Sequence, residues 1–326
     1  MKIYMAGTYS PSFEKKEWES LIQNRLLTYF EKPILDTFDS RINLFLDSGA
    51  YSAFTQKKEI KITEYIEYIK NNEDVIDIYA NLDVIGSAKD SWKNQRIMEK
   101  AGLQPLPVFH VEDKFKYLEK CIAEYPYFCI GGMATGYSSF ERTSFLDRCF
   151  AAMNVDGVPL NKIHGFGMTS FSLMWRYPWY SVDSTSWALT SAMGAIFVPR
   201  HRAGVWVYTE KEWKIDVSIR NSSKKSSYAY LPVKSKELIL RYISEKGFSL
   251  GKSELKNVPS NYILKDNERW SDKKSRAVEV IVEHGICNCH KQRYALNILY
   301  YQELADIISK TPYNIKFLQK KQSKFF

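Results

Sequence analysis

Short apolar runs alternate with segments of helical periodicity through the first 200 residues of the chain. Eight runs have the length of buried strands: residues 2–6, 44–47, 77–83, 105–110, 127–132, 162–167, 179–183 and 195–199. The segments between them predict helices over residues 13–30, 62–70, 89–100, 113–125, 140–152 and 170–177. Alternation of this kind predicts a parallel sheet covered by crossover helices. We therefore expect an α/β fold, a (βα)8 TIM-like barrel.

Six of the expected strands end on a polar residue or on glycine. These residues are Asp47, Asp83, His110, the pair Gly131 and Gly132, Gly165 and Asp183. In a parallel barrel the carboxyl ends of the strands converge on one rim, where the active site lies. The recurrence of these residues therefore predicts a single functional site at that rim.

Asp47 and Asp183 are the strongest candidates for chemistry. Each closes an apolar run and precedes small residues, such as Ser48 and Ser184, that leave room for a ligand. Two carboxylates at a barrel mouth can divide the work at an acetal-like carbon, one as nucleophile and the other as acid and then base. The alternative is that each aspartate caps the helix or turn that follows it.

Asp83, His110 and the pair Gly131-Gly132 could bind a flat heterocycle. A carboxylate accepts hydrogen bonds from the amide-like edge of a purine, and a glycine pair lets backbone N–H groups approach a ring closely. His110 either faces the site or is a histidine whose hydrogen bonds are satisfied at the top of the barrel. Aromatic residues form 15% of the chain and gather near Asp183, where they could stack on a base or pack in the core.

The whole chain has a formal net charge of +9, and its basic residues concentrate in the last third. Residues 1–200 hold 22 Lys and Arg against 24 Asp and Glu, whereas residues 201–326 hold 24 against 13. We expect two domains, a catalytic barrel over 1–200 and a basic, α-rich region over 201–326 that carries a nucleic-acid-binding surface. The alternative for the second region is an ordinary solvated basic face.

The cysteines and the N-terminus indicate the compartment. Five cysteines without a disulfide-like framework favour a reducing environment. The first ten residues, MKIYMAGTYS, lack the apolar core of a signal peptide, and no run of 18 apolar residues occurs. We expect a soluble, cytoplasmic protein with no membrane partner, and its oligomeric state is left open.

Three segments of the chain resemble motifs of one enzyme family. DSGAYSAF at 47–54 is similar to the DSGG(F/Y)Q segment of the tRNA-guanine transglycosylase (queuine tRNA-ribosyltransferase) superfamily, and IGGMA at 130–134 is similar to its GGL(A) segment. HGFGMTS followed by VDSTSW resembles its GVG segment and the aspartate-bearing strand after it. The resemblance covers roughly residues 40–200. The compact chain resembles phage-type members, some of which place 7-deazaguanines into DNA.

The resemblance implies a role for each matched residue. It makes Asp183 the nucleophile that attacks C1′ and releases guanine, Asp47 the acid/base group, and Asp83 the base-recognising carboxylate. It gives base-binding roles to further positions in or near the matched segments, namely Ser48, His110, Gly131, Gly132 and Gly165. His110 stands where the family usually has glutamine, and the segment after Asp183 lacks the family's Pro-Thr-Arg run. No redox or nucleotide cofactor is implied.

The family also carries a zinc motif, Cys-x-Cys-x-x-Cys with a later histidine. CNCHKQRY at 287–294 is similar, with glutamine at the third cysteine position. Cys287 and Cys289 cannot close a tetrahedral site alone, so His290 or His284 would have to complete it. A structural zinc ion and a site that has decayed both remain open.

The function that follows is replacement of guanine by a 7-deazaguanine in nucleic acid, through a covalent glycosyl-enzyme. We favour DNA over tRNA because the chain is compact and its C-terminal region departs from the tRNA enzymes. Two alternatives remain. One is a catalytically silent nucleic-acid-binding barrel, or partner of a true transglycosylase, and the other is an N-glycosidase that removes a base with water.

Overall fold

The protein divides into two compact units in its computed structural model, which describes residues 1–7, 17–36, 38–133, 136–155, 158–168, 170–221 and 225–312. Within this described part, the first unit comprises 1–7, 22–185 and 305–312, and the second comprises 17–21 and 186–304. The expected boundary at residue 200 thus lies inside the second unit. The first unit also takes in the end of the last helix, which sequence periodicity did not assign to the barrel.

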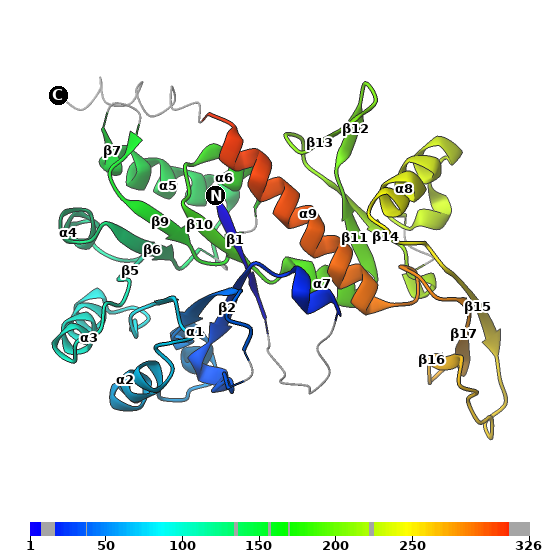
Figure 1. The fold of residues 1–326 in the computed structure, drawn as a ribbon, viewed down its shortest axis with the longest axis horizontal. Helices are drawn as coiled ribbons and strands as arrows, with labels where there is room; N and C mark the ends of the chain where they lie inside the picture. Colours follow the sequence, from blue (N-terminus) through cyan, green and yellow to red (C-terminus); the bar gives the residue numbers. More distant parts are fainter. Residues whose placement is uncertain are drawn as a thin grey trace. The chain divides into compact units, whose positions relative to one another are not determined.

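The first unit is built on an eight-stranded parallel sheet (Figure 1). Its strands are β1 (Lys2–Ala6), β2 (Asn24–Thr28), β3 (Asn43–Asp47), β4 (Ile78–Tyr79), β5 (Val108–His110), β6 (Tyr127–Gly131), β9 (Lys162–Gly165) and β10 (Ser181–Ser184). From β1 the neighbours are β2, β3 and β4 on one side, and β10, β9, β6 and β5 on the other. A parallel bridge between Ala80 and Leu106 links the segments beside β4 and β5. The sheet is therefore curled and TIM-barrel-like, with its strands in sequence order.

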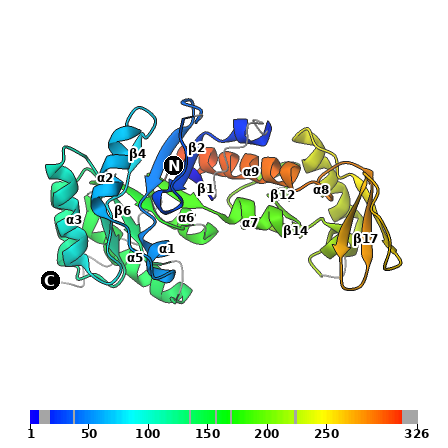
Figure 2. The ribbon, with the colours of Figure 1, turned by 90° about the horizontal axis from the view of Figure 1, so that it is seen from below.

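Helices lie on the outer side of this sheet (Figures 1 and 2). They are α1 (Ala50–Thr55), α2 (Ile62–Asn71), α3 (Ala88–Lys100), α4 (Lys116–Glu124), α5 (Ser139–Met153) and α6 (Phe171–Arg176), and a short hairpin of β7 (Asn154–Val155) and β8 (Val158–Pro159) follows α5. The periodicity over 62–70 correctly predicted α2, whose Tyr65 and Ile69 are buried. A capping box formed by Ser138 and Glu141 starts α5, which fixes its first turn.

Alternate residues of each strand face the two sides of the curled sheet. Aromatic, aliphatic and cysteine side chains fill the inside: Tyr4, Ala6, Leu26, Phe45, Ala80, Val108 and Cys129. A second core lies between the sheet and α2 and α3 and includes Leu27, Leu44, Leu46, Tyr65, Ile69 and Met98. The register places Tyr4 beside Asp183 and Thr28 beside Asp47, so both aspartates share a side of the sheet with the inner core.

Two of the sequence-based assignments are wrong. Residues 24–28 form β2, whereas the apolar spacing had predicted a helix over 13–30, of which 13–16 lie outside the described residues. Leu26 packs inside the sheet and Leu27 outside, so the strand is buried on both faces and lacks the alternation of a half-exposed strand. The expected eighth barrel strand, 195–199, instead forms β11 (Ala195–Val198), which pairs antiparallel with β14 (Trp213–Asp216) in the second unit.

The second unit is mixed α/β rather than α-rich. Its strands form three antiparallel sheets, β11 with β14, β12 (Arg200–Arg202) with β13 (Val205–Val207), and β15 (Lys252–Asn257), β17 (Ala277–Glu283) and β16 (Glu268–Asp272). Its helical segments are η1 (Glu17–Leu21), α7 (Ser186–Ala192), η3 (Ile219–Asn221), η4 (Tyr228–Tyr230), α8 (Val233–Glu245) and most of α9 (His290–Lys310). Aliphatic and aromatic residues of β11, β14, α8 and α9 form its core. Over the residues that the structure describes, no helix is both long and apolar enough to cross a membrane.

Candidate functional site

Three aspartates from the ends of β3 and β10 and from the segment after β4 influence one another electrostatically. Asp47 is the last residue of β3, and Asp183 lies near the end of β10. Burial of the carboxyl group, followed by the negative charges of Asp83 and Asp183, raises the pKa of Asp47 to about 7. The backbone N–H of Gly49, 3.2 Å from Oδ2 of Asp47, partly opposes this rise. Asp47 therefore sits near the midpoint of its titration at neutral pH.

Asp183 is held from two sides. The backbone N–H of Gly167 donates a 2.7 Å hydrogen bond to its Oδ1. Nε2 of His164 lies 3.4 Å from the same oxygen, which is within ion-pair distance but too long for a well-formed hydrogen bond. Because Oδ1 is occupied in this way, Oδ2 is the oxygen left to meet a ligand.

Asp83 is paired with His110 and Ser48. Its Oδ2 lies 3.0 Å from Nε2 of His110, and its Oδ1 accepts a 3.0 Å hydrogen bond from the Ser48 hydroxyl. Burial lowers the pKa of His110, but its hydrogen bond to Asp83, the charge of that carboxylate and the nearby Asp113 raise it to a net value above the ordinary one. The pair therefore favours a charged imidazolium beside a carboxylate.

The predicted glycines have different reasons to be glycine. Gly132 has a φ of +80°, which disfavours any other residue. A Cβ at Gly131 would lie 3.1 Å from Cδ2 of His110, so glycine lets the imidazole lie against β6. A Cβ at Gly165 would lie 2.9 Å from Cζ3 of Trp179. Tight packing thus accounts for Gly165 without a ligand.

The aromatic residues near Asp183 serve mainly the core. Trp179 is buried, and its indole N–H donates to the carbonyl of Leu173. Tyr177 is buried and donates its hydroxyl hydrogen to Asp147, which also binds Arg176. Packing and hydrogen bonding therefore explain these rings, as the alternative interpretation of the sequence had it.

The candidate zinc ligands, Cys287, Cys289, His284 and His290, lie in the second unit. Cys287 is buried, and burial raises the pKa of its thiol, which disfavours the thiolate that zinc needs. His290 is at the start of α9, with its ring 5.4 Å from that of Tyr294. Across the described residues, no group of three or more His, Cys, Asp or Glu side chains is placed to hold a metal ion. The residues present therefore do not fit a four-ligand zinc site.

A guanidinium group holds the loop that carries the two cysteines. Nη1 of Arg293 donates to the carbonyls of Ile286 and Cys287 at 2.7 and 3.3 Å, and its Nε donates to the carbonyl of Ser191 at 2.7 Å. These bonds tie the loop to α7 and α9. The guanidinium group of Arg293 therefore organises this loop.

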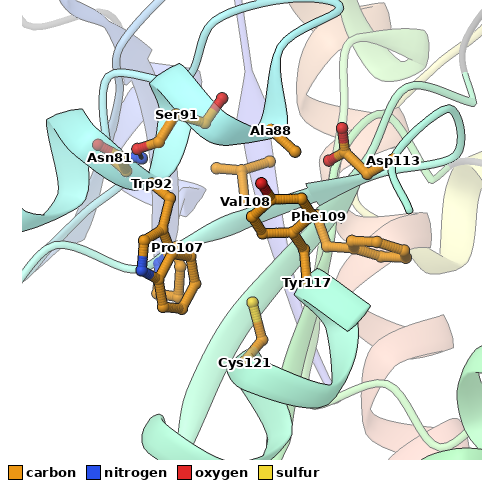
Figure 3. Close-up of a pocket in the computed structure, with 10 residues that line it drawn as sticks. All are labelled: Asn81, Ala88, Ser91, Trp92, Pro107, Val108, Phe109, Asp113, Tyr117 and Cys121. Carbon is orange, nitrogen blue, oxygen red and sulfur yellow. Dashed lines mark hydrogen bonds between the residues drawn. The ribbon is translucent and has the colours of Figure 1, made fainter. Parts of the chain in front are cut away.

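A small cavity lies between β5 and the helices α3 and α4 (Figure 3). Residues of α3, β5 and α4 surround it, among them Trp92, Val108, Tyr117 and Cys121, with Asp113 at one side. None of the candidate catalytic aspartates lines it. Because those aspartates lie outside it, we do not assign the reaction to this cavity.

Sequence reasoning missed three residues that contact the candidate site. Gly167 supplies the N–H that binds Asp183, and its φ of +61° is the conformation that glycine favours. His164 faces Asp183, and Ser181 in turn contacts His164. The HGFG segment contained the signal for Gly167, since two glycines after an apolar strand indicate a tight turn. The contact of His164 depends on how β9 pairs with β10, which no local pattern encodes.

No protein-family model matches the chain, and no curated protein matches its sequence. The resemblance to tRNA-guanine transglycosylases therefore rests on the quoted sequence motifs alone.

Proposed function

We propose that the protein is a nucleic-acid base-exchange transglycosylase that replaces guanine with a 7-deazaguanine. The observation that carries the proposal is the group of three strand-end aspartates, in which the charges of Asp83 and Asp183 help to raise the pKa of Asp47 to about 7. Carboxyl groups whose environments differ are suited to divide nucleophile and acid/base roles. The curled sheet is, in this proposal, a (βα)8 barrel, supported by the bridge between Ala80 and Leu106.

In the first half-reaction, Oδ2 of Asp183 attacks C1′ of the nucleotide. The Oδ2–C1′ bond forms, the C1′–N9 bond breaks, and its electron pair passes to N9 of guanine. Protonated Asp47 gives its proton to the departing base, which leaves as neutral guanine. Near its pKa of about 7, Asp47 is present in both protonation states at neutral pH, as a group that must act first as acid and then as base requires.

The second half-reaction reverses these steps with a new base. Asp47, now ionised, takes the N9 proton of the incoming 7-deazaguanine. The nitrogen then attacks C1′ and displaces the Asp183 carboxylate. No oxidant, reductant or cofactor is needed, because one glycosidic bond replaces another through the ester.

Base recognition falls to Asp83 and His110 in this proposal. Their contact, 3.0 Å between Oδ2 and Nε2, places a carboxyl group and an imidazole side by side, and the hydrogen bond and the charge of Asp83 act to raise the pKa of His110. A guanine-like edge presents adjacent donors and an acceptor, so a paired carboxylate and imidazolium can meet both kinds of group. Gly131 and Gly132 let the backbone after β6 lie close to His110, because a Cβ at either position would press on that residue or on Val111.

The polymer substrate would have to present the base extruded from its stack. The net charge of +11 over residues 201–326 supports a polyanionic partner. We favour DNA over tRNA because the chain is compact and its C-terminal region departs from the tRNA enzymes. The five cysteines are free, which suits a cytoplasmic enzyme.

Incorporation of labelled guanine tests the proposal. Wild type should place label into duplex DNA, single-stranded DNA or bulk tRNA, and Asp183→Asn should place none. Asp77→Asn is a matched control, because Asp77 precedes β4 and its Oδ2 accepts a hydrogen bond from the N–H of Leu44, an acceptor role that asparagine keeps. Label that persists with Asp183→Asn would rule out the covalent mechanism.

Two alternatives predict different products. An N-glycosidase would leave abasic sites and incorporate no base. A silent barrel would bind nucleic acid in a salt-sensitive manner without exchange or adduct. The same incubations, analysed for abasic sites and by filter binding over a range of salt concentrations, separate the three.

A further inference from the structure

A chain of polar side chains runs from Asp183 into the inner core of the barrel. Nε2 of His164 lies 3.4 Å from Oδ1 of Asp183, and Nδ1 of the same ring lies 2.7 Å from Oγ of Ser181. Oγ of Ser181 lies 2.6 Å from the hydroxyl of Tyr127. His164 and Ser181 are fully buried, whereas Tyr127 is half-buried.

The rings around His164 fix its orientation. Its ring centroid lies 4.6 Å from that of Phe45, 4.7 Å from Phe166 and 5.9 Å from Tyr4. Nε2 is fully buried and has no hydrogen-bond partner within the described chain. Buried polar atoms of this kind are rare in folded proteins and call for an explanation. The nearest acidic group is the carboxylate of Asp183, the proposed nucleophile.

The direction of the hydrogen bonds decides what His164 presents to Asp183. If Tyr127 donates to Ser181 and Ser181 donates to Nδ1, the hydrogen of the neutral ring is on Nε2, facing the carboxylate. In the opposite direction, a bare Nε2 lone pair would face Oδ1, and two acceptors would repel each other. The partner of one ring nitrogen sets the state of the other.

We propose that His164 is a positioning residue for Asp183, held as the neutral Nε2–H tautomer by a hydrogen bond that the Ser181 hydroxyl donates to Nδ1. The positioning role of His164 in catalysis rests on the proposed function, whereas the assignment of the tautomer is independent of it. With the N–H of Gly167, the Nε2–H group turns Oδ1 away from the substrate and leaves Oδ2 to attack. When the second base displaces Asp183, negative charge returns to the carboxylate, and the dipole of an N–H group 3.4 Å from Oδ1 stabilises that charge.

Nitrogen NMR of protein labelled with ¹⁵N-histidine tests the tautomer without any substrate. The chain has five histidines, and His164→Gln identifies the signals of His164 by their loss. Wild type should show a protonated Nε2 and an unprotonated Nδ1. Ser181→Ala should disturb this pattern, and Tyr127→Phe should leave it, since Ser181 can still donate. A protonated Nδ1, an imidazolium, or an unchanged pattern with Ser181→Ala would overturn the assignment.

Steady-state exchange tests positioning. His164→Leu should lower kcat by about 10- to 100-fold with KM unchanged, because the contact matters when charge returns to Asp183. His164→Gln should recover part of kcat, since its amide can place an N–H near the position of Nε2. Equal kcat for wild type and a folded His164→Leu variant would overturn the positioning role. Wild type without any exchange would instead overturn the proposed function, and the NMR result would still decide the tautomer.

Discussion

Replacing Asp47 with asparagine should stabilise the first unit at high pH. The folded protein holds the Asp47 proton with a pKa of about 7, whereas the unfolded chain holds it with the ordinary value of 3.8. The folded state thus binds this proton more tightly. Its stabilising effect is present at low pH and is lost as pH rises from about 4 through about 7.

The size of the effect follows from the shift. Each pKa unit corresponds to about 1.4 kcal/mol, so a shift from 3.8 to about 7 sets an upper limit of about 4 kcal/mol. The residue keeps some exposure, and solvent screening reduces the effect to about 2–4 kcal/mol. The advantage of Asp47→Asn over wild type should therefore grow by about 2–4 kcal/mol between about pH 4 and about pH 8.

The assay must report on the barrel alone, because the chain has two units. Hydrogen–deuterium exchange of β3 peptides during denaturant unfolding provides such a readout. Asp77→Asn, in the residue before β4, is the matched control for the aspartate-to-asparagine change itself. A constant difference between Asp47→Asn and wild type across the pH range would refute the account of the carboxylate cluster, as would destabilisation at about pH 8.

Three further predictions concern single features. Gly49→Ala should lower the free energy of unfolding by more than about 2 kcal/mol, because φ is +77° and a Cβ would overlap Oγ1 of Thr28. Gly102→Ala, where φ is +88° but the space around a Cβ is open, should lower it by about 1 kcal/mol. Equal losses for the two variants would disprove the overlap at Gly49. The purified protein should hold far less than one zinc per chain by elemental analysis, and a stoichiometry near one would contradict the conclusion that these residues do not fit a four-ligand zinc site. NMR titration should place the pKa of His110 above 6.5 in wild type and lower it with Asp83→Asn; an unchanged value would mean that Asp83 does not hold the charged ring.

Sequence patterns predicted those elements whose signal is local. The run that ends at Asp47 became β3, and the run that ends at Asp183 became β10, because short apolar strands bounded by polar residues need little context. Residues 24–28 were wrongly predicted to be helical, because the apolar spacing of a strand buried on both faces can match that of a helix. Residues 195–199 were correctly expected to be a strand but were given the wrong sheet, because pairing partners are decided by tertiary contacts.

The candidate site shows the same division. Strand ends predicted where Asp47, Asp83 and Asp183 would gather, because parallel strands share one functional rim. The pairing of Asp83 with His110 joins residues from different strand segments, and the contact of His164 with Ser181 requires the register between β9 and β10. Such contacts depend on distances across the sheet, which composition and periodicity do not contain.

Mass mapping of a trapped adduct tests directly whether Asp183 forms a covalent glycosyl-enzyme. Wild type would be incubated with guanine-containing DNA or tRNA without a second base, denatured and digested. The account predicts one nucleotide-bearing peptide, containing residue 183 and esterified at Asp183, and none from Asp183→Asn. An adduct on Asp47, or exchange of labelled guanine with no adduct at any residue, would contradict it.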